Sequence, residues 1–147
     1  MGRYVRIDMP TKKQAASAEG ACMTIAEVQV FANGVNVAPH GKATQSTTGL
    51  GVAKRAIDGN TNGKWSAGSC THTAYKQQNP WWEVDLGSAQ PIDRIVVWNR
   101  TDCCQERLEN FTLSVLDDAR QTLFTTAKVP RPTPKVSIKV EGASGTV

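Results

Sequence analysis

Short stretches in which hydrophobic and polar residues alternate recur along the whole chain. In Ala26–Val30 the valines fall on one side and the polar residues on the other, and Phe111–Val115 alternates in the same way. A period of two residues is that of a β-strand with one buried face. Eight segments rich in Val, Ile, Thr and aromatic residues are therefore predicted to be strands: Tyr4–Asp8, Met23–Phe31, Lys42–Ser46, Trp81–Leu86, Ile92–Trp98, Phe111–Leu116, Thr122–Ala127 and Val136–Val140.

Turn signals separate these segments, as at Asn33-Gly34, Asp58-Gly59 and Asn62-Gly63. No window shows helical periodicity, and there is no internal repeat or long linker. Eight short strands in 147 residues predict an all-β fold, an eight-stranded β-sandwich or jelly roll. A chain of this length forms a single domain, 1–147. The three tryptophans Trp81, Trp82 and Trp98 open or close strands and are predicted to lie in its core, and the polar stretch Thr11–Gly20 is predicted to be a surface loop.

Composition and charge exclude several functions. The chain is 39% hydrophobic and 20% charged, with a net charge of +4. Its basic residues are scattered, without the basic stripe and interleaved aromatics typical of nucleic-acid binding. No apolar run approaches membrane-spanning length, so membrane insertion is not expected. No signal peptide is recognisable, and a strand begins directly after Met1-Gly2, which predicts a domain excised from a larger secreted protein.

Four cysteines, Cys22, Cys70, Cys103 and Cys104, allow two disulfides. Zinc is disfavoured, because adjacent cysteines lack the C-x₂-C spacing and Cys70 with His72 has no second ligand pair. Disulfides imply an oxidising compartment. If Cys103 and Cys104 are bonded to each other, Cys22 and Cys70 remain as the other possible pair.

The segment Arg100–Arg107 places the two adjacent cysteines between two arginines and two acids. Adjacent Cα atoms are about 3.8 Å apart, whereas an ordinary disulfide joins Cα atoms about 4.4–6.8 Å apart, so this bond would close a small strained ring. Such a ring presents a flat, polarisable sulfur surface, which together with guanidinium donors suits a sugar. The alternative is a pair of reduced thiols in a turn.

A second cluster, Arg55–Asn60 with Ser69–His72, concentrates oxygen atoms. Asp58-Gly59-Asn60 offers a carboxylate, a tight turn and carbonyl groups, and Ser69 adds a hydroxyl. Hard oxygen donors packed into a loop are the ligands of Ca²⁺. The spacing is not that of an EF-hand, and a turn closed by an Asx hydrogen bond is the alternative.

Four segments together resemble the signature of a known family: Ala56–Thr61, Gly68–Thr73, Asn79–Leu86 and Asn99–Leu108. They are similar to those of the F-type lectins, fucose-binding lectins within the discoidin (F5/8 type C) superfamily. The resemblance covers most of residues 36–117. A His followed by Arg-x-Asp-Cys-Cys-x-Glu-Arg is that family's sugar-binding pattern.

The order of the segments departs from that family. Gly2–Ile7 and Met23–Val30 resemble its last two strands, which implies a circular permutant with residues 1–31 moved to the front. Tyr4–Asp8 is then predicted to pair antiparallel with Val136–Val140, and residues 143–147 to be frayed. Many family members have a cysteine at the position of Ala26 bonded to the one matching Cys70, which this chain cannot reproduce.

The resemblance implies a sugar site and a metal site. L-fucose would be bound by His72, Arg100 and Arg107, with the Cys103–Cys104 ring as a stacking surface and Asp102 and Glu106 supporting the arginines. Trp65 either completes that surface or packs in the core. A Ca²⁺ ion would be held by Asp58, the carbonyls of Arg55, Asn60 and Ala26, Ser69 and Glu27.

Catalysis is not expected, because Asp102 and Glu106 each have an arginine neighbour that lowers a carboxyl pKa and spoils a general acid. The expected function is a lectin for fucosylated glycans, extracellular or at the cell surface, and assembly into a homo-oligomer would add avidity. Two alternatives remain: a carbohydrate-binding accessory module of a larger enzyme, and a discoidin-type module that binds protein or phospholipid.

Overall fold

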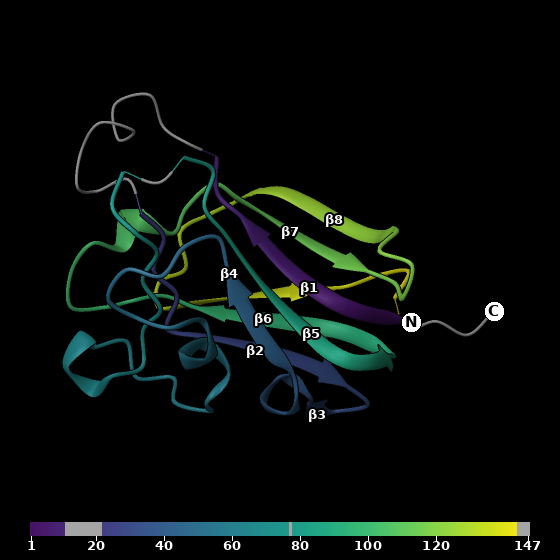
Figure 1. Cartoon of the computed structure of the whole chain (residues 1–147). Coiled ribbons are helices and arrows are strands. Elements are labelled where there is room, and N and C mark those ends of the chain that lie inside the picture. The colour runs from purple at the N-terminus through teal and green to yellow at the C-terminus, as the bar shows by residue number, and fades with distance from the viewer. Residues whose placement is uncertain (11–21, 77, 144–147) are drawn as a thin grey trace.

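The structure, a computed structural model, describes residues 1–10, 22–76 and 78–143. Its strands form two antiparallel sheets packed face to face (Figure 1). The strands are β1 (Gly2–Asp8), β2 (Glu27–Ala32), β3 (Val35–Asn36), β4 (Lys42–Gln45), β5 (Trp81–Gln90), β6 (Ile92–Trp98), β7 (Phe111–Leu116), β8 (Thr122–Val129) and β9 (Lys135–Lys139), and four 3₁₀ helices are η1 (Ala38–His40), η2 (Ala53–Ile57), η3 (Trp65–Ala67) and η4 (Gln105–Arg107).

The two sheets contain five and four strands, in the orders β4-β5-β1-β7-β8 and β3-β2-β6-β9. The predicted all-β sandwich is confirmed, but the described residues form nine strands rather than eight. The additional strand, β3, is only two residues long and pairs with the end of β2. A strand of two residues has no periodicity that could have predicted it.

Alternating residues of both sheets fill the space between them, including Val5 and Ile7 of β1. Trp82 is fully buried there and donates from Nε1 to the Ala53 carbonyl oxygen at 3.0 Å. The prediction that Trp81 and Trp98 lie in the core is wrong. Both are only partly buried, and Arg6 and Lys135 stack on their outer surfaces at 4.3 Å and 4.9 Å.

The N-terminal strand lies inside the five-stranded sheet, where β1 pairs antiparallel with both β5 and β7. The predicted pairing of Tyr4–Asp8 with Val136–Val140 is therefore wrong, because β9 pairs with β6 in the other sheet. β2 occupies an inner position of that second sheet. Residues 2–32 thus supply one inner strand to each sheet, while the circular permutation stays a prediction without support from strand pairing.

The C-terminal boundary also differs from the prediction at one residue. Ala143 is fully buried, and its carbonyl oxygen accepts a hydrogen bond of 3.1 Å from the Ile92 amide. Fraying is therefore wrong for Ala143. Residues 144–147 and the predicted loop Thr11–Gly20 lie outside the described residues.

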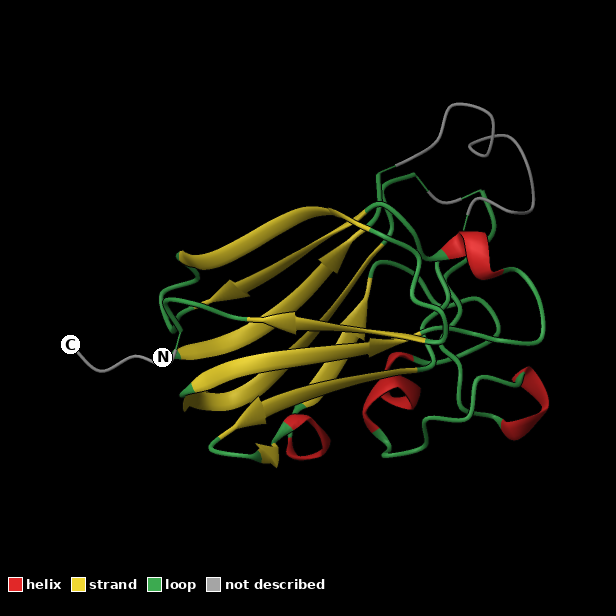
Figure 2. Cartoon of the chain, turned by 180° about the vertical axis from the view of Figure 1, so that it is seen from behind, coloured by secondary structure: helices red, strands yellow, loops and turns green. Residues whose placement is uncertain are grey.

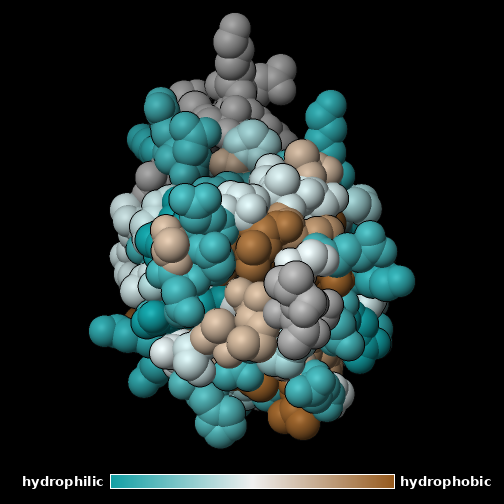
Figure 3. All heavy atoms as spheres, turned by 90° about the vertical axis from the view of Figure 1, so that its right-hand side faces the viewer, coloured by the Kyte–Doolittle hydropathy of each residue, from teal (hydrophilic) through white to brown (hydrophobic). Residues whose placement is uncertain are grey.

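Long loops gather at one end of the sandwich, together with η2, η3 and η4 (Figure 2). The opposite end is mainly hydrophilic, with an apolar area at its centre and further apolar residues at its lower edge (Figure 3). None of the helices in the described residues has the length and apolar character needed to cross a bilayer. The candidate site residues lie in these loops and 3₁₀ helices, except for Glu27 at the start of β2.

Candidate functional site

The segment 71–73, which carries His72, lies between two other extended segments, 23–25 and 49–51. On one side four hydrogen bonds of 2.8–3.1 Å join the threonines at its ends to 23–25. On the other side the backbone of His72 exchanges two hydrogen bonds with 49–51, of 2.8 and 3.0 Å. The position of the His72 backbone is thus fixed by two neighbours distant in sequence.

The contact with 49–51 depends on two glycines. A Cβ atom on Gly49 would lie 2.6 Å from the Thr73 carbonyl oxygen and 3.0 Å from His72 Nδ1. A Cβ atom on Gly51 would lie 2.4 Å from the Cys70 carbonyl oxygen. The loop therefore approaches the His72 segment only because both positions lack a side chain.

The imidazole ring of His72 is enclosed by two aromatic rings in edge-to-face contact. Trp65 lies with its centroid 5.6 Å away and Tyr75 with its centroid 5.0 Å away. Burial, helped by the charges of Arg107 and Arg100, lowers the pKa of His72 below its usual value. The ring is therefore neutral at physiological pH and can hydrogen-bond as both donor and acceptor.

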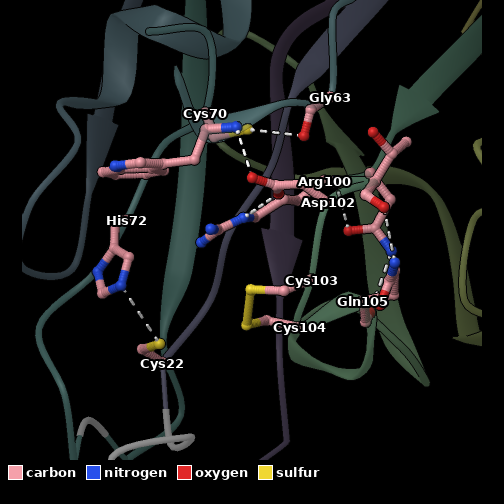
Figure 4. Close-up of a disulfide and its surroundings, with 12 residues drawn as sticks. Cys22, Gly63, Cys70, His72, Arg100, Asp102, Cys103, Cys104 and Gln105 are labelled. Atoms are coloured by element: carbon pink, nitrogen blue, oxygen red, sulfur yellow. Dashed lines mark hydrogen bonds and ion pairs between the residues drawn. A yellow bond between two sulfur atoms is a disulfide. The ribbon is translucent and has the colours of Figure 1, made fainter. Parts of the chain in front are cut away.

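Cys103 and Cys104 are bonded to each other, as predicted. Cys104 has a positive φ of 63°, and its carbonyl oxygen accepts from the Arg107 amide at 3.0 Å, which begins η4. Figure 4 shows the disulfide beside the Arg100 side chain, with the Cys22 sulfur and the His72 ring nearby. Cys22 and Cys70 are free and buried, so the second possible disulfide is absent.

Arg100 is held in place before any ligand arrives. Its Nε donates to Asp102 Oδ1 at 2.6 Å, and its guanidinium lies 5.1 Å from the Trp65 ring centroid. Asp102 Oδ2 also accepts from the Trp65 amide at 3.1 Å. The Arg100 hydrogen bond lowers the pKa of Asp102, so this carboxyl is a support and is unsuited to be a general acid.

Arg107 has fewer protein partners. Its guanidinium lies 5.7 Å from the Tyr75 ring centroid, and its Nε is buried without a hydrogen-bond partner among the described residues. Glu106 is exposed, and in the described part of the chain no ion pair links it to either arginine. The predicted support of an arginine by Glu106 therefore stays a prediction without a direct contact behind it.

Trp65 belongs to the site rather than to the core. It is half-buried, and the Arg55 and Arg100 guanidinium groups both lie over its ring, at 5.7 and 5.1 Å. The predicted sugar-site residues His72, Arg100, Arg107, Trp65 and the disulfide thus come together at one end of the sandwich. Their contact with a sugar stays a prediction.

Sequence reasoning missed two residues of this cluster. Tyr75 is the only aromatic residue in the polar stretch 73–79, which was the available signal. Asn99 is buried, and its side-chain amide donates to the carbonyl oxygens of Gln105 and Pro132 at 3.0 and 3.3 Å. It fixes the loop that carries the disulfide, and its only sequence signal was its place at the start of the segment Asn99–Leu108.

The candidate metal residues centre on Glu27. This side chain is fully buried at the start of β2, and its Oε2 accepts from the Gly59 amide at 2.8 Å. Its Oε1 is buried without a partner among the described residues. Burial and the neighbouring carboxylate of Asp58 raise the pKa of Glu27 to about 8. A cation between the two carboxylates would offset both the cost of burying the charged Glu27 carboxylate and its repulsion by Asp58.

Two of the other candidate ligands, Asp58 and Ser69, already have hydrogen-bond partners in the protein. Asp58 Oδ1 accepts from the Asn60 amide at 2.9 Å, so the alternative Asx turn is present. Ser69 donates its hydroxyl hydrogen to the Asn62 carbonyl oxygen. Within the described ranges no three His, Cys, Asp or Glu side chains are grouped so that they could hold a metal ion by themselves. The residues fit a hard cation that takes two carboxylates and several carbonyl oxygens.

Together, the fold and the site define a discoidin-like β-sandwich domain with a basic, disulfide-containing surface at its loop end. The chain belongs to the family of NedA-like, galactose-binding domains of the F5/8 type C group, whose model matches residues 55–146.

The curated relatives include fucolectins and a fusion protein. Fucolectin of Anguilla anguilla is 43% identical over 86 residues, 54% of either chain. Fucolectin-1 of Anguilla japonica is 48% identical over 79 residues, 50% of this chain and 44% of the relative. The pentraxin fusion protein of Xenopus laevis is 38% identical over 82 residues, 54% of this chain and 20% of the relative. The chain thus spans about half the length of the fucolectins it matches.

Two solved structures have the same fold. A fucose binding module of Streptococcus pneumoniae is 33% identical with a TM-score of 0.69, covering 76% of this chain and 80% of that one. A His 62 mutant of the lectin binding domain of Lectinolysin, complexed with Lewis b, is 29% identical with the same TM-score and coverage. These comparisons support the resemblance drawn from the sequence motifs.

Proposed function

We propose that this domain is a lectin that binds L-fucose on glycans at the cluster of His72, Arg100, Arg107, Trp65 and the Cys103–Cys104 ring. The observation that carries this function is the buried Nε of Arg107, which has no partner in the described protein. A buried donor left unpaired costs free energy, and a ligand oxygen would satisfy it. The fucolectin relatives and the fucose binding module support the choice of fucose.

Each part of the cluster has a distinct role toward the sugar. The two guanidinium groups only donate, so they suit the lone pairs of hydroxyl groups and of the ring oxygen. His72 contacts one further hydroxyl. The disulfide and Trp65 offer a flat surface for the apolar edge of the ring and for the methyl group of fucose. Because a monosaccharide makes few contacts, we expect a monovalent dissociation constant between about 10 µM and 1 mM.

We further propose that Ca²⁺ is bound by the carboxylates of Glu27 and Asp58, with carbonyl groups of Ala26, Arg55 and Asn60 and with Ser69. When bound, the ion supplies positive charge that stabilises these carboxylates. The chain's own contribution is to hold β2 against the loop at Gly59. That loop leads through Ser69 to the His72 segment, so the metal site would brace the sugar site.

The relatives also bear on the setting in which the domain acts. The fucolectins are lectins, and the pentraxin fusion protein is a longer chain of which this domain matches 20%. We propose a non-enzymatic, extracellular or cell-surface module, which can be part of a larger protein.

The deciding experiment is a glycan array followed by calorimetric titration with methyl α-L-fucoside and methyl α-D-galactoside. We expect binding to fucosylated glycans and weaker binding to galactose, because galactose has a hydroxymethyl group where fucose has its methyl. Stronger binding to galactose would overturn the choice of sugar. Binding to phospholipid vesicles without binding to any glycan would favour the discoidin-type alternative.

A further inference from the structure

The two ring nitrogen atoms of His72 have different partners. Nδ1 lies 2.6 Å from the Thr73 carbonyl oxygen. A carbonyl oxygen can only accept, so Nδ1 carries the hydrogen of the neutral ring. Nε2 is then left with a lone pair and can only accept.

Cys22 supplies the hydrogen-bond partner of this lone pair. Its Sγ lies 3.9 Å from His72 Nε2 (Figure 4), and its side chain is buried and not disulfide-bonded. Burial raises the pKa of Cys22, so the thiol keeps its hydrogen. A thiol is a weak donor, which makes this the most easily replaced hydrogen bond around the ring. The described residues provide no other donor to Nε2.

We infer that the Cys22 thiol occupies, in the free protein, the place of a ligand hydroxyl at His72 Nε2. This inference rests on the proposed sugar-binding function. Only 1% of the His72 surface is exposed, so a ligand reaches the ring only by displacing a neighbour. On binding, a sugar hydroxyl donates its hydrogen to Nε2 in place of the thiol, while its oxygen accepts from a guanidinium group.

This arrangement restricts the ligand chemically. The hydroxyl that faces His72 must carry its own hydrogen, because Nε2 has none to give. A methyl ether or acetyl ester at that hydroxyl still offers an oxygen to the arginines, but it has no hydrogen for Nε2. The site therefore takes sugars with a free hydroxyl at this position and rejects their O-methylated and O-acetylated forms.

The first test observes both groups directly in the wild-type protein and in Cys70→Ala. Cys70 is the matched control, because it is the other free buried cysteine and its thiol donates to the Gly63 carbonyl oxygen at 3.7 Å, away from His72. Nitrogen-15 spectra of labelled histidine should show hydrogen on Nδ1 of His72 with and without sugar. In Cys70→Ala, the remaining infrared S–H band should shift when methyl α-L-fucoside saturates the site. Hydrogen on Nε2, or an unchanged S–H band, would overturn the inference.

The second test asks whether substitution of Cys22 raises or lowers the affinity for the fucoside. Cys22→Ala removes the competitor for the lone pair, so fucoside affinity should rise about two- to fivefold. Cys70→Ala should leave the affinity unchanged. Cys22→Ser, which is close to cysteine in size and carries a stronger donor, should lower the affinity and serves if the alanine variant is too unstable to measure.

The outcomes separate the two hypotheses. If wild type binds no fucoside, the proposed function fails. If wild type binds but Cys22→Ala binds no more tightly, or Cys22→Ser binds more tightly, Cys22 does not compete with the ligand, and the inference fails while the proposed function stands.

Discussion

Two clusters at the loop end of the sandwich carry opposite unsatisfied groups. In the sugar cluster the orphan is a donor, Arg107 Nε. In the metal cluster it is a carboxyl oxygen, Glu27 Oε1, which is an acceptor once the carboxyl has lost its proton. Buried polar atoms are normally paired, so an orphan of each kind predicts a ligand of the complementary kind. The first cluster is suited to a neutral polyol with exposed lone pairs, and the second to a cation.

The two clusters also differ in how much of their geometry exists without a ligand. Arg100 is already fixed by Asp102 and Trp65, and the disulfide is closed. The metal cluster instead buries Glu27 with a pKa of about 8 beside Asp58, so the charged form of Glu27 is unfavourable without a cation. Sugar binding should therefore depend on a few donors, whereas metal binding should appear mainly as stability.

The largest expected effect is that of Arg107→Ala. Loss of two charge-assisted hydrogen bonds should cost about 3 kcal/mol or more, which is about 100-fold or more in fucoside affinity. Arg107→Lys should lose nearly as much, since an ammonium group lacks the planar fork. Calorimetric titration measures both, with Arg94→Ala on the outer surface of the four-stranded sheet as a control. Wild-type affinity in Arg107→Ala would place the site elsewhere.

The next largest effect is expected on thermal stability when Ca²⁺ is removed from the proposed metal site. Ca²⁺ at about 100 times its dissociation constant stabilises a protein by about 2.7 kcal/mol, so excess EDTA should lower the melting temperature by about 5–10 °C. Glu27→Gln should abolish the difference between melting curves with Ca²⁺ and with EDTA. Glu141→Gln, which changes an exposed acid, should preserve it. Identical wild-type curves in the two conditions would count against a bound ion.

Opening the vicinal disulfide should have an intermediate effect. If the disulfide ring covers about 50 Å² of apolar sugar surface, losing this contact costs about 1.3 kcal/mol of binding free energy. The fucoside affinity should then fall close to tenfold. Titration with and without reductant measures this loss, and Cys103→Ser should reproduce it without reductant. Cys22 and Cys70 are free thiols and should not contribute to the effect of reductant. Unchanged affinity after confirmed reduction would remove the disulfide from the contact surface.

Local patterns explain which features of the fold could be predicted. Period-two alternation identified the strands of both sheets except the two-residue β3, since it reflects burial of one face. The adjacency of Cys103 and Cys104, together with flanking arginines, identified the centre of the site. The partner of β1 could not be predicted in this way, because Val5 and Ile7 would bury equally well beside any hydrophobic strand.

The contacts at the site that could not be predicted from the sequence have a similar cause. Asp102 and Glu106 both neighbour an arginine in the sequence, yet only Asp102 turns toward one. The contact of Cys22 with His72 spans 50 residues and follows from the hydrogen bonds between 23–25 and 71–73. Such contacts are set by tertiary packing, and no spacing in the sequence encodes them.

The smallest expected effect is that of Asp102→Asn, which tests whether Arg100 is truly fixed before binding. The pair is partly exposed, and such pairs contribute about 0–1 kcal/mol, so fucoside affinity should fall by no more than about fivefold. The pKa of Asp102 is lowered in the folded protein, so the carboxylate and its contact persist at neutral pH and are lost only as pH falls through that lowered pKa. The ratio of wild-type to variant affinity should therefore stay constant from neutral to mildly acidic pH and approach one below the usual pKa range of aspartate. Titrations across that range, with Asp118→Asn as an exposed control, measure the ratio. A loss as large as that of Arg107→Ala would mean that Asp102 itself contacts the sugar.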